Sequence, residues 1–156
     1  GPEPLRSGVM LEVPSLAWQL HTLLPRVDFV AIGTNDLLQF FFAADRSNPK
    51  LADRYDLLSP AALNFIHQVV AICNTQGVDV SVCGEVGGRP LEAMILLGLG
   101  LRRLSMSPAS IAPVKLMIRS LNLESITTFA ESLLAKPDHS VRNYAIEYAE
   151  SHNISV

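Results

Sequence analysis

The chain of 156 residues has the length of one domain, and its 49% hydrophobic and 17% charged residues are typical of a layered folded protein, not of a tail or linker. A net charge of -3 without a basic stripe argues against a nucleic-acid-binding surface. The longest apolar run, 93–101, is too short to cross a bilayer and no secretory signal is recognisable, so we expect a cytoplasmic protein with reduced cysteines.

The first half of the chain predicts two strands and two helices. A strand over 7–14 is followed by leucines at helical spacing over 15–24. A second strand covers 28–36, and a polar and aromatic connection over 37–59 leads to a helix that begins at Pro60.

This helix carries clear end signals. Ser59 is placed to cap it and Gly77 to stop it. One face of the helix is apolar and consists of Leu63, Ile66, Val70 and Cys73.

The second half continues the alternation. A third strand covers 78–85, a helix covers 89–100, and a fourth strand covers 101–107. Ser110 is the expected cap of the next helix, whose apolar face is Val114, Met117, Ile118 and Leu121.

Two further helices follow without intervening strands. Asn122 is the expected cap of the first, which ends before Pro137, and Ser140 is the expected cap of the second. The predicted apolar face of the last helix is Val141, Tyr144, Ala145 and Tyr148.

Four strands separated by helices predict an α/β fold with a parallel sheet and right-handed crossovers. A complete (β/α)8 barrel needs about 250 residues, so the pattern fits either a small open sheet or half of a barrel. In both, the carboxyl ends of the strands share one functional rim. The predicted strands end in polar groups that can converge there: Glu12, Asn35, Asp36, Cys83, Glu85, Ser105 and Ser107.

Two carboxylates of this rim suit a hard divalent cation. Glu12 and Asp36 follow consecutive strands, and Mg2+ takes one or two protein carboxylates together with water and substrate oxygens. The alternative is that Asp36 only caps the following turn while Glu12 is solvated.

Three other residues carry candidate chemistry. The guanidinium of Arg46 can grip a phosphate or carboxylate, with backbone amides at Asn35 and Asp36 as additional donors; alternatively, it forms a surface pair with Asp45. The thiol of Cys83 stays largely protonated at neutral pH and can donate a proton, or it is a small packed hydrophobe.

Three stretches together resemble a known family: "GVMLEVPS", "AIGTNDLLQFFFAADRSNP" and "SVCGEVGGRPLEAMILLGLGLRRLSMSPASIAPVK". They are similar to the phosphoenolpyruvate (PEP)-utilising C-terminal domain of enzyme I of the bacterial phosphotransferase system. The residues of the last stretch are more similar to the nitrogen-related enzyme I than to the sugar-transport enzyme I. The resemblance covers residues 8–121, and the helices of 122–156 carry no diagnostic motif of the family. It implies that residues 1–156 form one partial PEP-utilising barrel domain.

The resemblance implies that the chain supplies strands five to eight of a (β/α)8 TIM barrel. It also implies that Glu12 and Asp36 are Mg2+ ligands, that Asn35, Asp36 and Arg46 bind substrate, and that Cys83 protonates the enolate of pyruvate. Arg89 stands where family members more often carry an acidic residue.

The implied activity is phosphoryl transfer from PEP to an enzyme histidine and then to a phosphocarrier protein of the HPr/NPr type, in a homodimer. We expect the chain to be a fragment that is inactive alone. A barrel related to pyruvate phosphate dikinase or PEP synthase and a non-catalytic dimerisation module remain alternatives.

Overall fold

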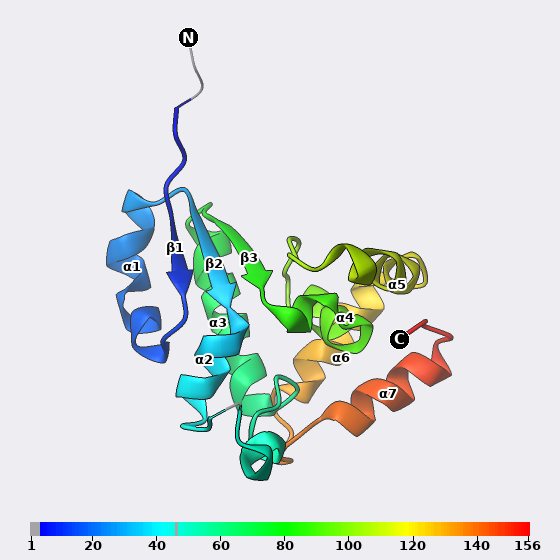
Figure 1. Ribbon diagram of the computed structural model, residues 1–156. Helices are drawn as coiled ribbons and strands as arrows, with labels where there is room; N and C mark the ends of the chain where they lie inside the picture. The colour runs from blue at the N-terminus through cyan, green and yellow to red at the C-terminus, as the bar shows by residue number, and fades with distance from the viewer. Residues whose placement is uncertain (1–3, 46) are drawn as a thin grey trace.

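The computed structural model describes residues 4–45 and 47–156 as an α/β structure built on a parallel sheet. The sheet has the order β1-β2-β3, with β1 at Gly8–Leu11, β2 at Phe29–Gly33 and β3 at Asp79–Cys83. All three strands point the same way in Figure 1, so their carboxyl ends share one edge of the sheet.

The predicted fourth strand is wrong as an element, although its segment lies where such a strand would pair. Leu104 forms a single parallel bridge with Val82 of β3. The amide of Val82 donates to the carbonyl of Arg103 at 3.0 Å, and that of Ser105 donates to the carbonyl of Val82 at 2.8 Å. The guanidinium of Arg102 binds the carbonyls of Leu97 and Leu101, at 2.8 Å each.

Helices cover the sheet and continue beyond it (Figure 1). The α-helices in chain order are α1 (Leu20–Leu23), α2 (Thr34–Phe41), α3 (Pro60–Thr75), α4 (Pro90–Gly98), α5 (Pro108–Arg119), α6 (Leu123–Leu133) and α7 (Arg142–Ser151). Short 3₁₀ turns are η1 (Pro14–Gln19), η2 (Leu24–Arg26), η3 (Pro49–Arg54) and η4 (Glu85–Gly88).

Two predicted boundaries in the first half need correction. The helix expected over 15–24 is one α turn between η1 and η2, and Pro25 has no amide with which to continue the α-helical hydrogen bonds of α1. The strand expected over 28–36 ends at Gly33, and the next residues already belong to α2.

The predictions for α3 are confirmed. The hydroxyl of Ser59 accepts a hydrogen bond from the amide of Ala62 at 3.2 Å, which satisfies an unpaired donor of the first turn. Gly77 has φ +69°, a conformation that favours glycine and ends the helix. The four predicted face residues, Leu63, Ile66, Val70 and Cys73, are all buried.

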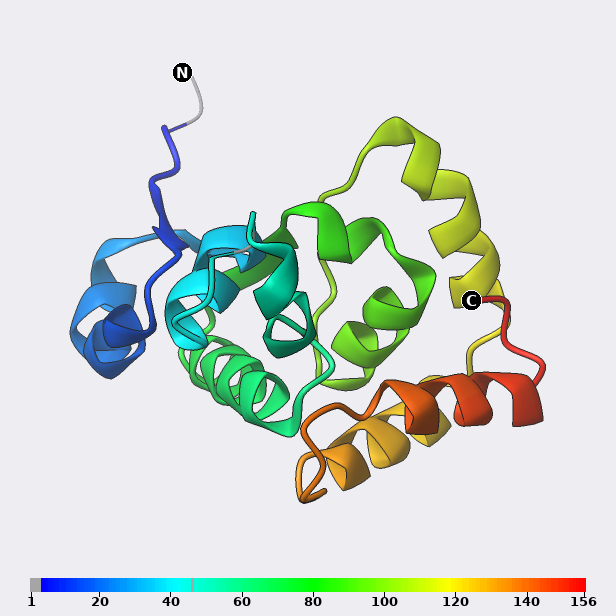
Figure 2. The ribbon, with the colours of Figure 1, turned by 60° about the horizontal axis from the view of Figure 1, so that its bottom comes forward.

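The core has two parts. The first lies between the sheet and α3 and includes Leu11, Ile32 and Val82 from the strands. The second joins α4 to α5, α6 and α7, which lie together to one side of the sheet (Figure 2). Within the described residues, no helix combines the length and apolar character needed to span a membrane.

The closing helices correct some predicted details. Ser107, not Ser110, occupies the N-cap position of α5, and Ile118 of that helix is 44% exposed. Asn122 caps α6 as predicted, accepting from the amide of Ser125 at 2.9 Å.

The expected cap and apolar face of α7 also shift. Val141 holds the N-cap position, while the hydroxyl of Ser140 accepts from the amide of Arg142 at 3.3 Å. Ala149 replaces Tyr144 on the buried face, because Tyr144 is 37% exposed.

Candidate functional site

The carboxyl ends of the three strands open into a pocket of about 330 Å³. Parallel α/β folds bind ligands at this edge. The pocket is lined by Met10, Glu12, Gly33, Thr34, Asn35, Asp36, Cys83 and Gly84. It therefore brings together Glu12, Asn35, Asp36 and Cys83, while Glu85, Ser105 and Ser107 do not line it.

Strand register and one glycine place Glu12 in this pocket. Leu11 pairs with Ile32, so the next residues, Glu12 and Gly33, leave their strands side by side. A Cβ on Gly33 would lie 2.7 Å from Cγ of Glu12, which real Cβ atoms essentially never show. Gly33 therefore leaves the space that the Glu12 side chain occupies. Cys83 is the register partner of Gly33 on the other side, so this glycine separates the carboxylate strand from the thiol strand.

Asn35 and Asp36 lie in the first turn of α2, directly after β2. An anionic group is favourable there because the unpaired amides of a helix start carry partial positive charge. The hydroxyl of Tyr55 donates to the carbonyl of Asn35, so the connection before α3 contacts the same turn. This arrangement gives the pocket an amide and a carboxylate from one helical turn.

The Cys83 thiol faces a carboxylate and a backbone carbonyl. Its Sγ donates to the carbonyl of Ile32 at 3.5 Å. Burial and then the charge of Glu12 raise the pKa of Cys83, and its own backbone lowers it by less. The thiol is therefore protonated at neutral pH. Cys73 is fully buried in α3, and burial raises its pKa to about 11, in keeping with a packing role.

Thr34 and Gly84 also line the pocket, although neither was predicted as a site residue from the sequence. The hydroxyl of Thr34, which is fully buried, donates to the carbonyl of Cys83 at 2.9 Å. Gly84 has φ +108°, and a Cβ there would lie 2.5 Å from Oγ1 of Thr34. The signals in the chain were a hydroxyl residue between a strand and a polar pair, and a glycine directly after the cysteine.

The donor set of the pocket fits a hard cation of the Mg2+ type. Glu12 and Asp36 offer carboxylate oxygens and Asn35 offers an amide oxygen. Among the described residues, no three or more His, Cys, Asp or Glu side chains form a group that could hold a metal by themselves. Mg2+ commonly uses only one or two protein carboxylates and completes its shell with water and substrate oxygens, and Glu12 and Asp36 match that number.

Two arginines were singled out from the sequence, Arg46 and Arg89, and the structure describes only Arg89. Arg46, the predicted phosphate ligand, lies outside the described residues. Its neighbour Asp45 accepts hydrogen bonds from the amide and hydroxyl of Ser47, at 2.8 and 2.7 Å. Arg89 lies 3.9 Å from Glu85 and 3.8 Å from Glu92, so two carboxylates lie near its guanidinium.

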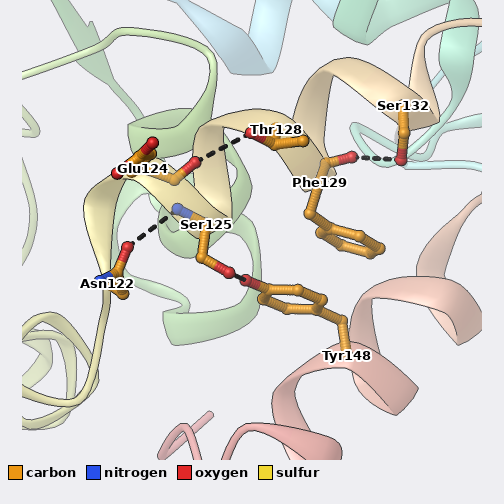
Figure 3. A pocket seen from close by; sticks show the side chains of 7 residues that line it. All are labelled: Asn122, Glu124, Ser125, Thr128, Phe129, Ser132 and Tyr148. Atoms are coloured by element: carbon orange, nitrogen blue, oxygen red, sulfur yellow. Dashed lines mark hydrogen bonds between the residues drawn. The ribbon is translucent and has the colours of Figure 1, made fainter.

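A larger hollow of about 690 Å³ is lined by residues of α6 and by Tyr148 of α7 (Figure 3), and it shares no lining residue with the strand-end pocket. Its hydroxyls already have partners within the hollow. Thr128 donates to the carbonyl of Glu124 at 3.2 Å, Ser132 donates to that of Phe129 at 2.6 Å, and the Ser125 hydroxyl lies 2.7 Å from that of Tyr148. The strand-end pocket is the better candidate site because it gathers ionisable groups from three elements.

Comparison with known proteins identifies the family. The family model described as "PEP-utilising enzyme, PEP-binding domain" matches residues 2–123, which include every residue that lines the strand-end pocket. A Salmonella typhimurium (strain LT2) protein named "Phosphoenolpyruvate-dependent phosphotransferase system" is 41% identical over 150 residues, covering 96% of this chain and 20% of its own length.

Two other relatives have similar relationships. "Phosphoenolpyruvate-protein phosphotransferase" of Borreliella burgdorferi is 40% identical over 132 residues, covering 85% of this chain and 23% of its own length. "Multiphosphoryl transfer protein 1" of Escherichia coli (strain K12) is 38% identical over 128 residues, covering 82% and 15%. The chain spans less than a quarter of the length of these relatives. From the family match and these identities, the chain belongs to the PEP-binding domain family of PEP-utilising enzymes.

Proposed function

We propose that this chain is part of a phosphoenolpyruvate-protein phosphotransferase and supplies strands five to eight of its (β/α)8 barrel, where the segment with the single bridge at Leu104 takes the place of the last strand. One observation carries the proposal: Glu12, Asn35, Asp36 and Cys83 line a single pocket at the carboxyl edge of a parallel sheet. The names of the Salmonella and Borreliella relatives support the phosphotransferase assignment. In this proposal the site lies within 8–121, and 122–156 add the closing helices of the same partial domain.

In this proposal the carboxylates of Glu12 and Asp36 would hold Mg2+, and Asn35 would contact the phosphoryl group. When bound, Mg2+ neutralises negative charge on the phosphoryl group and on the enolate oxygen. Arg46 is proposed as an additional phosphate ligand. Phosphoryl transfer depends mainly on positioning and charge neutralisation, and the pocket offers hard oxygen ligands from two neighbouring strand ends for both purposes.

Conversion of PEP to pyruvate by phosphoryl transfer requires one proton, and in this proposal a side chain of this protein donates it. The bond between phosphorus and the enol oxygen of PEP breaks as a bond forms to a histidine of the full-length enzyme. The leaving enolate then takes a proton at its methylene carbon from Sγ of Cys83, which gives pyruvate and a thiolate that solvent reprotonates. The raised pKa of Cys83 supports this role, because the thiol is in its acid form at neutral pH.

The phosphorylated enzyme passes its phosphoryl group to a phosphocarrier protein of the HPr/NPr type, in the nitrogen-related branch of the family. The relatives named for the phosphotransferase system support a carrier partner. A dikinase or PEP synthase barrel would share the PEP chemistry but not the carrier. The domain order of the full-length protein separates these two enzyme classes.

The test is Asp36→Ala in the full-length enzyme. We expect Mg2+-dependent autophosphorylation from labelled PEP to be lost. Asp138→Ala is the matched control, because Asp138 is an exposed carboxylate before α7 and does not line the pocket. Autophosphorylation of the Asp36→Ala enzyme at the normal rate would show that the metal assignment is wrong.

Association is a second candidate function. β1 is an edge strand of the sheet, and edge strands offer unpaired backbone groups to another chain. Nearby apolar side chains are open to solvent, with Met10 51% and Trp18 83% exposed. We expect the isolated chain to self-associate and the full-length enzyme to be a homodimer. A monomer by light scattering with a cooperative thermal transition would contradict the expectation for the isolated chain.

A further inference from the structure

A buried hydroxyl links the two strand ends that carry the proposed acid and the proposed phosphoryl ligand. Thr34 is fully buried, and its Oγ1 donates to the carbonyl of Cys83 at 2.9 Å. The other buried polar side chains among the described residues, Ser59 and Glu92, bind a helix start and an arginine away from the pocket. Of these three buried polar residues, Thr34 is the one whose hydrogen-bond partner, Cys83, lines the pocket.

This hydrogen bond lies just past the last register pair of the sheet. Gly33 pairs with Cys83 at the end of β2 and β3. After this pair, the segment that follows β2 enters α2, and the segment that follows β3 turns at Gly84. Sheet hydrogen bonds therefore no longer determine the distance between these two segments. The bond from Thr34 continues the connection between the two chains by one residue.

Packing against Gly84 reinforces the same link. A Cβ on Gly84 would lie 2.5 Å from Oγ1 of Thr34 and 3.4 Å from Oδ1 of Asn35. The close approach means that the residue after Cys83 packs directly against the residues that begin α2. The Thr34 hydroxyl therefore restrains Cys83 both through its carbonyl and through the next residue.

We infer that Thr34 is a positioning residue for Cys83, which fixes the thiol relative to Asn35 and Glu12 in the pocket. The thiol must reach one carbon of the bound enolate, and a displacement of about 1 Å can cost roughly 100-fold in rate. This inference rests on the proposed function, because it assumes that Cys83 delivers the proton.

The test compares Thr34→Val with Thr34→Ser in the full-length enzyme. Valine keeps the branched shape without the donor, and serine keeps the donor without the methyl group. The measurements are kcat and KM for pyruvate formation from PEP, with excess phosphocarrier protein present to accept the phosphoryl group, and the exchange of pyruvate methyl protons in D2O, which reports proton transfer at the same carbon. Thr75→Val is the matched control, because the exposed Thr75 donates similarly to the carbonyl of Ala71 at 2.8 Å in α3.

For Thr34→Val we expect kcat and methyl exchange to fall together by roughly 10- to 100-fold, with KM for PEP within about twofold of wild type. Thr34→Ser should recover most of both rates, and Thr75→Val should leave both unchanged. If Thr34→Val fails to fold by circular dichroism, Thr34→Ala, which removes the hydroxyl and adds no bulk, takes its place.

Wild-type rates in Thr34→Val, or equal losses in the valine and serine variants, would overturn the inference. Failure of the proposed function looks different, because the unmodified full-length enzyme would then form no pyruvate from PEP. An active wild-type enzyme with an unaffected valine variant removes only the role of Thr34.

Discussion

Arg142, the first residue of α7, donates from Nη2 to Oε1 of Glu92 in α4 at 2.8 Å. The same guanidinium binds both carboxylate oxygens of Asp56, from Nη2 at 2.8 Å and from Nε at 3.3 Å. Glu92 is only 3% exposed, and carboxylates are rarely buried unless paired. One arginine thus joins the last helix to α4 and to the segment before α3.

Arg142→Met should destabilise the fold, because Asp56 loses its arginine partner and buried Glu92 keeps only Arg89, at 3.8 Å, in place of Arg142 at 2.8 Å. Removing one partner of a buried ion pair costs about 3–5 kcal/mol. The Arg142 side chain is 38% exposed, so we expect roughly 2–3 kcal/mol, below the range for a fully buried pair. Urea unfolding measures the change. Arg119→Met is the control, because Arg119 is an exposed arginine of α5. Adding Glu92→Gln to Arg142→Met should recover part of the lost stability. Equal urea midpoints for Arg142→Met and Arg119→Met would contradict the structural role of Arg142.

Stability should fall in acid partly through Asp56. Burial alone would raise its pKa, but hydrogen bonds from Arg142, Leu58 and Ser140 lower it overall. A carboxylate with a lowered pKa in the folded state stabilises it fully above the unfolded value, about 3.9, and loses that contribution as pH falls through the folded pKa. Unfolding free energy should therefore drop more steeply below about pH 4 in wild type than in Asp56→Asn. Parallel pH curves for the two proteins would exclude this contribution.

Gly84→Ala should cost more than Gly77→Ala, although both glycines have positive φ. Gly77 has φ +69°, and a Cβ added there would have no atom within 4 Å, so alanine costs only the left-handed backbone strain, about 1–2 kcal/mol. At Gly84 the added Cβ also meets Oγ1 of Thr34 at 2.5 Å. We expect a further 1–3 kcal/mol, about the cost of overpacking a core, in thermal or urea unfolding. The excess should shrink when Thr34→Ala is combined with Gly84→Ala.

The two cysteines should differ in alkylation. The thiolate is the reactive form, and raised pKa values keep both thiols protonated near neutrality. Cys83 lines the pocket, whereas Cys73 is fully buried. Iodoacetamide followed by mass spectrometry should therefore modify Cys83 slowly at neutral pH, faster as the solution becomes alkaline, and Cys73 only in denaturant. Rapid modification of Cys83 at neutral pH would show a lowered pKa and contradict its assignment as the acid.

Sequence patterns were sufficient where one element carries its own signal. The cap at Ser59, the buried face of α3 and the cap at Asn122 were all predicted and are confirmed. The expectation that polar strand ends converge is confirmed for Glu12, Asn35, Asp36 and Cys83, because strand ends of a parallel sheet share an edge. Their chemical roles remain predictions.

The predictions were wrong where neighbours decide the outcome. The fourth strand is reduced to one bridge at Leu104, because pairing depends on how that segment meets β3 and not on its own apolar content. The final face of α7 uses Ala149 in place of Tyr144, since the position of α4 and α6 determines which side of that helix is covered.

The residues by themselves determined the alternation of strands and helices and the chemical types at the strand ends, because local periodicity and turn chemistry need only nearby residues. Only the tertiary structure revealed the bond from Thr34 to Cys83, 49 positions apart, and that from Arg142 to Glu92, 50 positions apart. Such pairs leave no periodic mark in the chain. Their partners are selected by strand register and helix packing, which exist only once the whole chain has folded.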